Sequence, residues 1–284
     1  MYVVTGITGQ VGGVVARGLL AYGRKVRAVV RSAGKGAAWK ERGCEIAVVD
    51  LSDATATTEA FRGASAVFLL LPPIFDPSPG FPEFRALAEV LRSALLAARP
   101  NRLVVLSTIG AQAAQSNLLT QLGLVEHTLG DLPIPVAFLR AAWFMENSAW
   151  DVPAAREGKV RSFLQPLDKP VPMVATADIG RLAATMMQED WSGKRIVELE
   201  GPRRVRPNEV AEAFARALGH PVDAEIVSRD SWESLFLAQG MKNPGPRMRM
   251  LDGFNEGWIE FEGPSRKGET TVETVIAELV RRGG

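Results

Sequence analysis

The fold is decided by Tyr2-Val3-Val4-Thr5-Gly6-Ile7-Thr8-Gly9-Gln10-Val11-Gly12, at the start of the chain. A short apolar strand runs into a glycine-rich turn, and apolar residues at helical spacing follow. In a βαβ unit of this kind, Gly6 permits the tight turn, Gly9 lets a backbone approach a pyrophosphate, and Gly12 lets the helix pack close to the sheet. The helix N-terminus then faces the anion. The stretch therefore predicts a dinucleotide-binding unit rather than an ordinary strand–helix turn.

The second strand of this unit ends at Arg31, where the residue type distinguishes two dinucleotides. Sites for NAD usually place Asp or Glu there to bind the ribose 2′-hydroxyl, whereas Arg suits the 2′-phosphate of NADP. Residues 1–40 contain no Asp or Glu. A guanidinium also donates two parallel hydrogen bonds to a phosphate. We therefore expect NADPH as the cofactor, with Arg31 on its 2′-phosphate; the alternative is that Arg31 is a solvated surface charge.

The composition is that of an ordinary globular protein. The 284 residues are 46% hydrophobic and 23% charged, and the net charge of +1 gives no electrostatic reason to expect a nucleic acid partner. The single cysteine, Cys44, excludes an internal disulfide framework and fits a reducing compartment. The longest apolar run, residues 64–75, is broken by two prolines and is too short to span a membrane. We expect a cytoplasmic protein with a small-molecule partner and no membrane contact; a homodimer is compatible with this composition.

Apolar strands and helices continue to alternate as far as residue 139. Strands that are apolar throughout and separated by helices indicate a parallel sheet covered on both faces. The predicted fold class is therefore α/β, with a doubly wound parallel Rossmann sheet at 1–142 as the NADP-binding domain. Shorter, mixed elements predict a smaller α+β substrate-binding region, packed on that domain, at 143–284. The expected strands are 45–49, 66–71, 102–106, 136–139, 159–163, 195–199 and 223–227, and the expected helices are 37–42, 54–61, 83–99, 118–129, 176–188, 207–218 and 270–281.

Ligands of doubly wound sheets bind beyond the carboxyl ends of the strands. We expect Asp50, after the third strand, to meet the adenine amino group or, equally well, to cap the following helix. The loop at 72–82 carries five prolines. It either forms a wall of the substrate cleft or is an ordinary connecting loop. The expected cofactor contacts are Gly6, Thr8, Gly9, Gln10, Val11, Gly12, Arg31, Asp50, Leu51, Leu71, Pro72, Ser107 and Thr108.

Two segments resemble one known family. Residues 4–12 are similar to the opening of the extended, atypical short-chain dehydrogenase/reductases, and Leu139-Arg140-Ala141-Ala142-Trp143-Phe144-Met145-Glu146-Asn147 resembles the "LRPxxFMEN" segment of their NmrA-like branch. Later stretches around Asp178-Ile179 and residues 253–258 are similar to that branch as well. The resemblance implies an NADP(H)-binding Rossmann domain with a small C-terminal domain that lines a cleft. The branch includes quinone and dye reductases and also redox-sensing regulators that bind the dinucleotide without turning it over.

The usual proton-donating pair of short-chain dehydrogenases is absent. These enzymes use Tyr-x-x-x-Lys, but the only tyrosines here are Tyr2 and Tyr22, and neither is followed by Lys at the fourth position. This absence also argues against a sugar-nucleotide epimerase, which shares the fold but needs the pair. Ser107 stands where the family serine is expected. Glu126 fits a glutamate of the NmrA-like pattern, but the lysine that commonly lies four residues before it is Leu122.

The remaining catalytic candidate is His127, which either donates a proton near neutral pH or is an ordinary helix-surface residue. Ser107 and His127 are the catalytic residues that we predict. Two distant histidines and one cysteine assemble no usual metal site, and no Gly-x-Ser-x-Gly elbow of a hydrolase occurs.

A hydride acceptor needs a flat, apolar surface more than it needs a protein acid, because a quinone or dye can take its proton from water. Phe75, Trp143, Phe144 and Asn147 are the predicted substrate contacts; the alternative for each aromatic residue is ordinary core packing. The sequence therefore predicts an NADPH-dependent reductase of a small apolar, aromatic or quinone-like acceptor. The alternative is a non-catalytic NADP(H)-sensing regulator.

Overall fold

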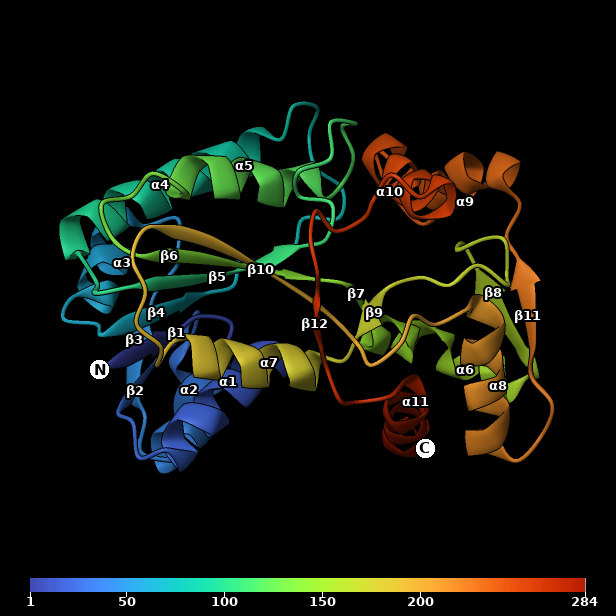
Figure 1. Ribbon diagram of the computed structural model, residues 1–284, viewed down its shortest axis with the longest axis horizontal. Coiled ribbons are helices and arrows are strands. Elements are labelled where there is room, and N and C mark those ends of the chain that lie inside the picture. Colours follow the sequence, from blue (N-terminus) through green and yellow to red (C-terminus); the bar gives the residue numbers. More distant parts are fainter. Residues whose placement is uncertain (284) are drawn as a thin grey trace.

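The computed structural model describes residues 1–283 and contains one large parallel sheet with helices on both faces (Figure 1). Every neighbouring pair in this sheet is parallel, which confirms the predicted doubly wound α/β fold. In order across the sheet, the strands are β12 (Arg266–Lys267), β10 (Lys194–Glu200), β6 (Val136–Ala141), β5 (Leu103–Thr108), β4 (Ala66–Leu69), β1 (Tyr2–Val4), β2 (Val26–Val30) and β3 (Glu45–Val48).

Helices cover both faces of the sheet (Figure 1). They are α1 (Gln10–Ala21), α2 (Ala33–Glu41) and α7 (Thr176–Met186) on one face, and α3 (Ala54–Phe61), α4 (Pro82–Ala98) and α5 (Thr120–Leu129) on the other. Successive residues of β4 serve the two faces in turn: Phe68 packs in the core under α1 and α7, whereas Val67 and Leu69 pack in the core under α3 and α4. Strands buried on both faces explain the unbroken apolar runs in the sequence.

Residues 143–283 form a second group of elements around a core of their own, in which Phe214, Trp232 and Phe236 are fully buried. The chain returns from this group to the large sheet, since α7, β10 and β12 belong to that sheet and its cover. The division at residue 142 stays a prediction. The elements of this group are β7 (Trp143–Phe144) paired with β9 (Met173–Val174), β8 (Lys159–Ser162) paired with β11 (Asp223–Ile226), the 3-10 turns Met145–Asp151 and Arg229–Ser231, and the helices α6 (Val152–Arg156), α8 (Pro207–Leu218), α9 (Trp232–Ala238), α10 (Gly245–Glu256) and α11 (Val272–Arg282).

Some boundaries differ from the predicted ones for local reasons. Strand β6 continues to Ala141 because it is paired on both sides, so Arg140 lies inside the strand, between Ser107 of β5 and Glu198 of β10. Helix α2 begins at Ala33, earlier than expected, since its glycines are poor helix formers and hid the helical pattern. Gly36 is needed there, because a Cβ would lie 2.9 Å from Ile46 Cγ2 of β3.

None of the helices within residues 1–283 combines the length and the apolar content that crossing a membrane requires.

Candidate active site

Gly6 and Gly12 shape the turn between β1 and α1. Gly6 has a φ of 61°, in the left-handed region that favours glycine. A Cβ on Gly12 would lie 2.3 Å from the Gly6 carbonyl oxygen, so only glycine lets α1 begin this close to the turn. Thr5 ties the turn to β4, because its Oγ1 accepts from the Leu70 N–H at 2.7 Å and donates to the Leu70 carbonyl oxygen at 3.1 Å. We call residues 6–12 the glycine turn; its backbone is fixed by these contacts.

The N-terminus of α1 has backbone N–H groups that no side chain caps. Its N-cap residue, Gly9, has no side chain to accept a hydrogen bond, and the first turn of the helix carries no acid. Such N–H groups, at the positive end of the helix dipole, bind anions. Gly9 is exposed, and a Cβ there would meet only the Gly6 carbonyl oxygen, at 3.3 Å. Packing within the protein would therefore nearly allow a larger residue at position 9, whereas the close approach of a pyrophosphate would require glycine there.

The other residues of the glycine turn differ in exposure. Thr8 and Gln10 are exposed beside the helix N-terminus, whereas Val11 is buried and offers only its N–H. Gln10 also reaches α7, where its side-chain amide lies 3.2 Å from Thr176 Oγ1. An uncapped helix end with small or polar residues around it fits the pyrophosphate of a dinucleotide.

Arg31 follows β2 directly and is exposed, and it forms no ion pair with any of residues 1–283. Asp50 lies just after the neighbouring strand β3, and its carboxylate accepts from the Ser52 N–H at 2.9 Å and from Ser52 Oγ at 2.7 Å. These hydrogen bonds, with a smaller contribution from the charge of Arg31, lower the pKa of Asp50. The cap of α3 is Asp53, which accepts from the Ala56 N–H at 3.0 Å, so the alternative role of Asp50 as a helix cap is wrong.

The proline-rich loop at 72–82 is fastened to the second group of elements. Asp76 accepts from the N–H groups of Lys242 and Asn243, both at 2.8 Å, and these bonds lower the pKa of its carboxyl. The Asn243 side chain donates in turn to the Pro77 carbonyl oxygen at 2.9 Å. The loop therefore joins the sheet to the segment that precedes α10. Of the residues expected at the site here, Leu51 is half-buried, Leu71 is buried, and Pro72 and Phe75 are exposed.

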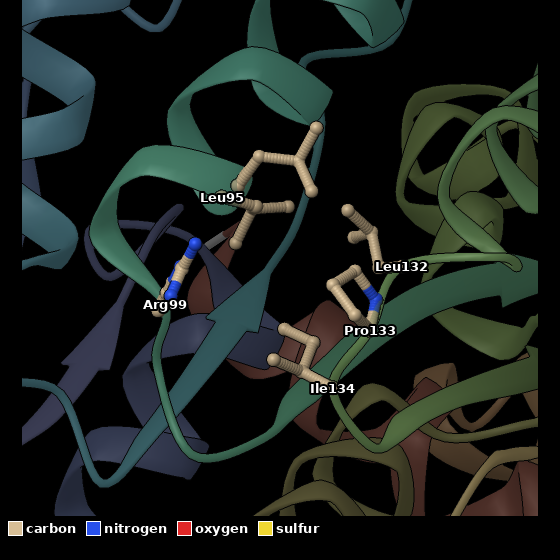
Figure 2. Close-up of a pocket in the computed structure, with 6 residues that line it drawn as sticks. Leu95, Arg99, Leu132, Pro133 and Ile134 are labelled. Atoms are coloured by element: carbon tan, nitrogen blue, oxygen red, sulfur yellow. The ribbon is translucent and has the colours of Figure 1, made fainter.

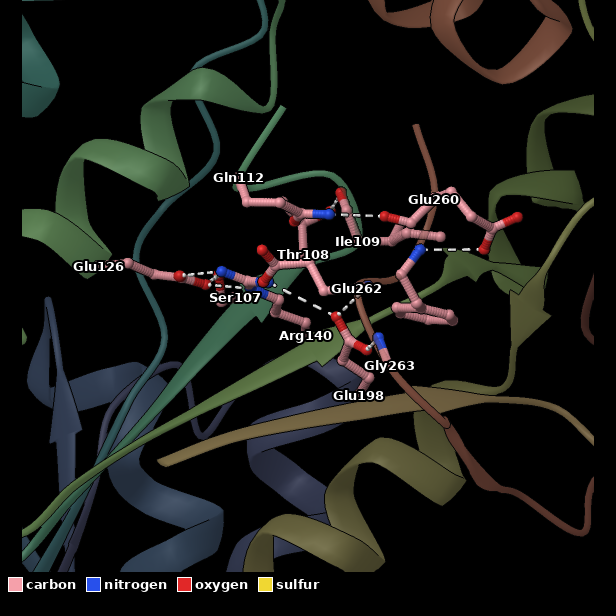
Figure 3. A network of polar contacts seen from close by, with 11 residues as sticks. Ser107, Thr108, Ile109, Gln112, Glu126, Arg140, Glu198, Glu260, Glu262 and Gly263 are labelled. Atoms are coloured by element: carbon pink, nitrogen blue, oxygen red, sulfur yellow. Dashed lines mark hydrogen bonds and ion pairs between the residues drawn. The ribbon is translucent and has the colours of Figure 1, made fainter. Parts of the chain in front are cut away.

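Near the carboxyl ends of β5, β6 and β10, charged side chains gather around Arg140 (Figure 3). Arg140 is only 3% exposed. Its Nε and Nη2 donate to the two carboxylate oxygens of Glu126, at 2.9 and 2.7 Å, and its Nη1 donates to Glu262 and lies 3.5 Å from Glu198 Oε1. Burial alone would lower the pKa of the Arg140 guanidinium, but the hydrogen bonds and charges of Glu126 and Glu262 outweigh it and raise that pKa. Ser107 Oγ donates to Glu126 Oε1 at 2.5 Å. We call these five residues the Arg140 cluster.

The segment between α10 and β12 crosses over this cluster. Glu198 accepts from the N–H groups of Glu262 and Gly263, at 3.0 and 2.9 Å, and the Gln112 side chain donates to the Glu260 carbonyl oxygen at 2.7 Å. Figure 3 shows the segment lying across the strand ends, with Thr108 on the same side. The large sheet and the segment that follows α10 therefore meet at the predicted active-site edge of the sheet.

The predicted substrate residues lie at different depths. Trp143 and Phe144 of β7 are half-buried, and the ring of Trp143 packs edge-on against Phe254 with 5.3 Å between the ring centres. Asn147 is exposed in the 3-10 turn that follows. His127 is exposed on α5, and because consecutive residues of a helix diverge by about 100°, it does not share the side on which Glu126 contacts Ser107. The catalytic and substrate roles of these residues stay predictions.

From the sequence, Arg140 was named only within the segment that resembles the NmrA-like branch, and Glu126 was matched to a glutamate of that pattern without a role. One signal was available: a charged residue inside an otherwise apolar, fully buried strand requires a charged partner. Glu146 was missed as well. It accepts from the Thr176 N–H at 2.9 Å and from Thr176 Oγ1 at 2.6 Å at the start of α7, and burial raises the pKa of its carboxyl.

A hollow of about 240 Å³ lies at the opposite edge of the sheet (Figure 2). Arg99 follows the end of α4, and Pro133 and Ile134 precede β6, so this hollow is at the amino ends of the strands. It is smaller than typical ligand pockets of roughly 300–1,000 Å³ and lies away from the switch point of the sheet. The glycine turn and the strand ends around it remain the candidate site.

The proteins that are similar to this chain include two reductases of known structure and an azoreductase. An NAD(P)H azoreductase from Xenophilus azovorans is 25% identical over 258 residues, which cover 90% of this chain and 85% of the azoreductase. The NADPH-dependent quinone oxidoreductase of Escherichia coli, solved with NADPH, has a TM-score of 0.83 at 22% identity and covers 98% of this chain and 99% of its own. The triphenylmethane reductase of Citrobacter sp., solved with NADP(H), has a TM-score of 0.80 at 19% identity, with coverage of 98% and 99%. The sequence profile of the NmrA-like family matches residues 2–243, and the chain belongs to this family.

Proposed function

We propose that the protein is an NADPH-dependent reductase that transfers a hydride to a small apolar, aromatic or quinone-like acceptor. The observation that carries the proposal is the glycine turn: an uncapped helix N-terminus, with no acid in its first turn, follows a strand in the middle of a doubly wound sheet. The proteins similar to this chain are described as an azoreductase, a quinone oxidoreductase and a triphenylmethane reductase, which supports the same class of acceptor.

The cofactor would lie across the carboxyl ends of β1, β2 and β4. The N–H groups of residues 10–12 would hold its pyrophosphate, and Arg31, exposed and without an ion pair within residues 1–283, would hold the 2′-phosphate. Asp50 is hydrogen-bonded to Ser52 and its carboxyl is influenced by the charge of Arg31, and we expect it to border the adenine. When bound, NADPH supplies the hydride, that is, two electrons and one proton.

The chain's own contribution to the reaction is mainly orientation and exclusion of water. Trp143 and Phe144 are half-buried directly after β6 and offer apolar surface to a flat acceptor. Their strand, β7, is held by pairing with β9 and by the contact between Trp143 and Phe254. A surface that is already packed in this way can position an acceptor without moving.

An assay of turnover tests this function. The protein is mixed with NADPH and a panel of quinones, azo dyes and triarylmethane dyes, and the absorbance of the reduced cofactor is followed. We expect oxidation of NADPH with at least one acceptor class. Tight binding of NADPH without turnover across the panel would contradict the reductase and favour the alternative, a regulator that senses the dinucleotide.

The cofactor assignment has a separate test in Arg31→Ala. Loss of a charge-assisted pair to a phosphate should weaken NADPH binding by about tenfold or more and leave NADH binding unchanged. Arg24→Ala is the matched control, because Arg24 is an exposed arginine at the other end of β2, where it donates to Gln188. Equal effects of the two substitutions on NADPH affinity would contradict the assignment.

A further inference from the structure

We propose that Arg140, acting through Glu126, fixes Ser107 as a hydrogen-bond acceptor, so that Ser107 gives no proton to the substrate. The site would then favour acceptors whose reduced form needs no proton from the protein, such as quinones, over isolated ketones. This inference rests on the proposed function of the same site and narrows its substrate class.

The chemistry of the two side chains decides which of them donates in the hydrogen bond between Ser107 and Glu126. A serine hydroxyl has one hydrogen, and an ionised carboxylate can only accept. Ser107 is 3% exposed, and its Oγ lies 2.5 Å from Glu126 Oε1, a short distance typical of a hydroxyl that donates to a carboxylate. The hydrogen of Ser107 is thus committed to Glu126, and only its lone pairs remain for a ligand.

Arg140 holds the carboxylate of Glu126 in place. Its guanidinium donates to both carboxylate oxygens of Glu126, in the bidentate geometry that fixes direction as well as charge. Arg140 is itself held by pairing on both sides of β6 and by Glu262. Arg140 and Glu126 are therefore positioning residues.

The two classes of substrate differ in where negative charge develops when they accept a hydride. A quinone that accepts a hydride becomes a hydroquinone monoanion, in which the ring spreads the charge, and this anion then takes a proton from water. A ketone that accepts a hydride becomes an alkoxide with a localised charge, and its formation needs an acid or a hydrogen-bond donor in the transition state. A Ser107 whose hydrogen points to Glu126 cannot be that donor.

The test frees the Ser107 hydrogen. In Glu126→Met, the hydroxyl loses its acceptor, while Arg140 keeps Glu198 and Glu262. Reduction of acetophenone and of 1,4-naphthoquinone with NADPH is measured by product formation. We expect the ratio of kcat/KM for the ketone to that for the quinone to rise about tenfold, less than the effect of a fully preorganised oxyanion donor.

Further variants test whether the rise in the kcat/KM ratio depends on Ser107. In Glu126→Met combined with Ser107→Ala, the ratio should return to the wild-type value. Glu262→Met is the matched control, because the carboxylate of Glu262 also accepts a hydrogen bond from Arg140 but has no hydrogen bond with Ser107, and this substitution should change the ratio by less than about twofold. Glu126→Asp is the variant to use if Glu126→Met does not fold: it keeps a charge for Arg140 but is one methylene too short to bond both groups, so the ratio should rise as well.

An unchanged ratio in a folded, NADPH-binding Glu126 variant would overturn the proposal, and so would a wild type that reduces acetophenone as efficiently as naphthoquinone. If the wild type reduces no acceptor at all, the proposed function fails. Thermal unfolding then tests whether Glu126 positions Ser107. Ser107→Ala should lower Tm clearly in the wild type and much less in the Glu126→Met background. Equal shifts in the two backgrounds would overturn the positioning of Ser107 by Glu126.

Discussion

The glycine turn and the Arg140 cluster lie at the same edge of the sheet but are built in different ways. The turn is made of consecutive residues, and its shape depends on backbone atoms that approach each other closely, such as the position of Gly12 against the Gly6 carbonyl. The cluster joins α5, β5, β6, β10 and the segment after α10, and it depends on one buried guanidinium that pairs with several carboxylates. A region of the first kind is most sensitive to atoms added at its close contacts, whereas a region of the second kind is most sensitive to removal of its central charge.

Removing the central charge should have the largest effect on stability. Arg140→Met would leave Glu126 and Glu198 buried without a cation, and breaking a buried pair in this way costs about 3–5 kcal/mol of unfolding free energy. Denaturant unfolding of the variant and the wild type measures the difference. Arg92→Met is the control, since Arg92 pairs with Asp131 at the surface, and should cost no more than about 1 kcal/mol. Similar losses in the two variants would show that the cluster is not a special source of stability.

The glycine turn should respond to added volume instead. Gly12→Ala places a Cβ 2.3 Å from a backbone oxygen, so α1 must shift, and we expect a loss of about 2–4 kcal/mol together with loss of NADPH binding. Gly9→Ala meets the same oxygen at 3.3 Å, so it should cost less than about 1 kcal/mol while still weakening NADPH binding. Unfolding curves and cofactor titrations of both variants separate packing from binding. A Gly9→Ala variant that binds NADPH normally would remove the pyrophosphate from this turn.

The same contrast explains how much the sequence could predict. The doubly wound sheet and the glycine turn were predictable because each βαβ unit repeats a local pattern of apolar strand, turn and helix. The return of β10 and β12 to the sheet, and the helix α2 with its two glycines, depended on contacts with distant strands, which propensity does not encode.

For the candidate site, the sequence could point to the strand ends but not to the partners of each side chain. Ser107 was predicted at its position, yet its bond to Glu126 brings together residues 19 apart, and the contact of Arg140 with Glu262 spans 122 residues. Such contacts follow from the order of the strands, which fixes β5, β6 and β10 side by side. The role of Asp50 was left open between two alternatives, and only the hydrogen bond from Ala56 to Asp53 excluded the cap.

The carboxyl of Asp151 offers a further comparison with the Arg140 cluster. It is shielded from water as well, but it forms no ion pair with a cation within residues 1–283. Burial raises its pKa to about 7, well above that of an unfolded chain. The folded state therefore prefers the protonated acid, so this group lowers stability as pH rises from about 4 to about 7 and has a constant effect above that. Asp151→Asn should gain about 1–2 kcal/mol at pH 8 and nothing at pH 4.

Thermal or denaturant unfolding at the two pH values measures this difference. The control is Asp223→Asn, since Asp223 is exposed at the start of β11 and should change stability equally at both. If Asp151→Asn left the pH dependence of stability unchanged, burial without a cation would not be the reason that this carboxyl differs from those around Arg140. The comparison would then have to be drawn between buried and exposed groups rather than between paired and unpaired ones, because pairing with a guanidinium would no longer distinguish Glu126 and Glu198 from Asp151.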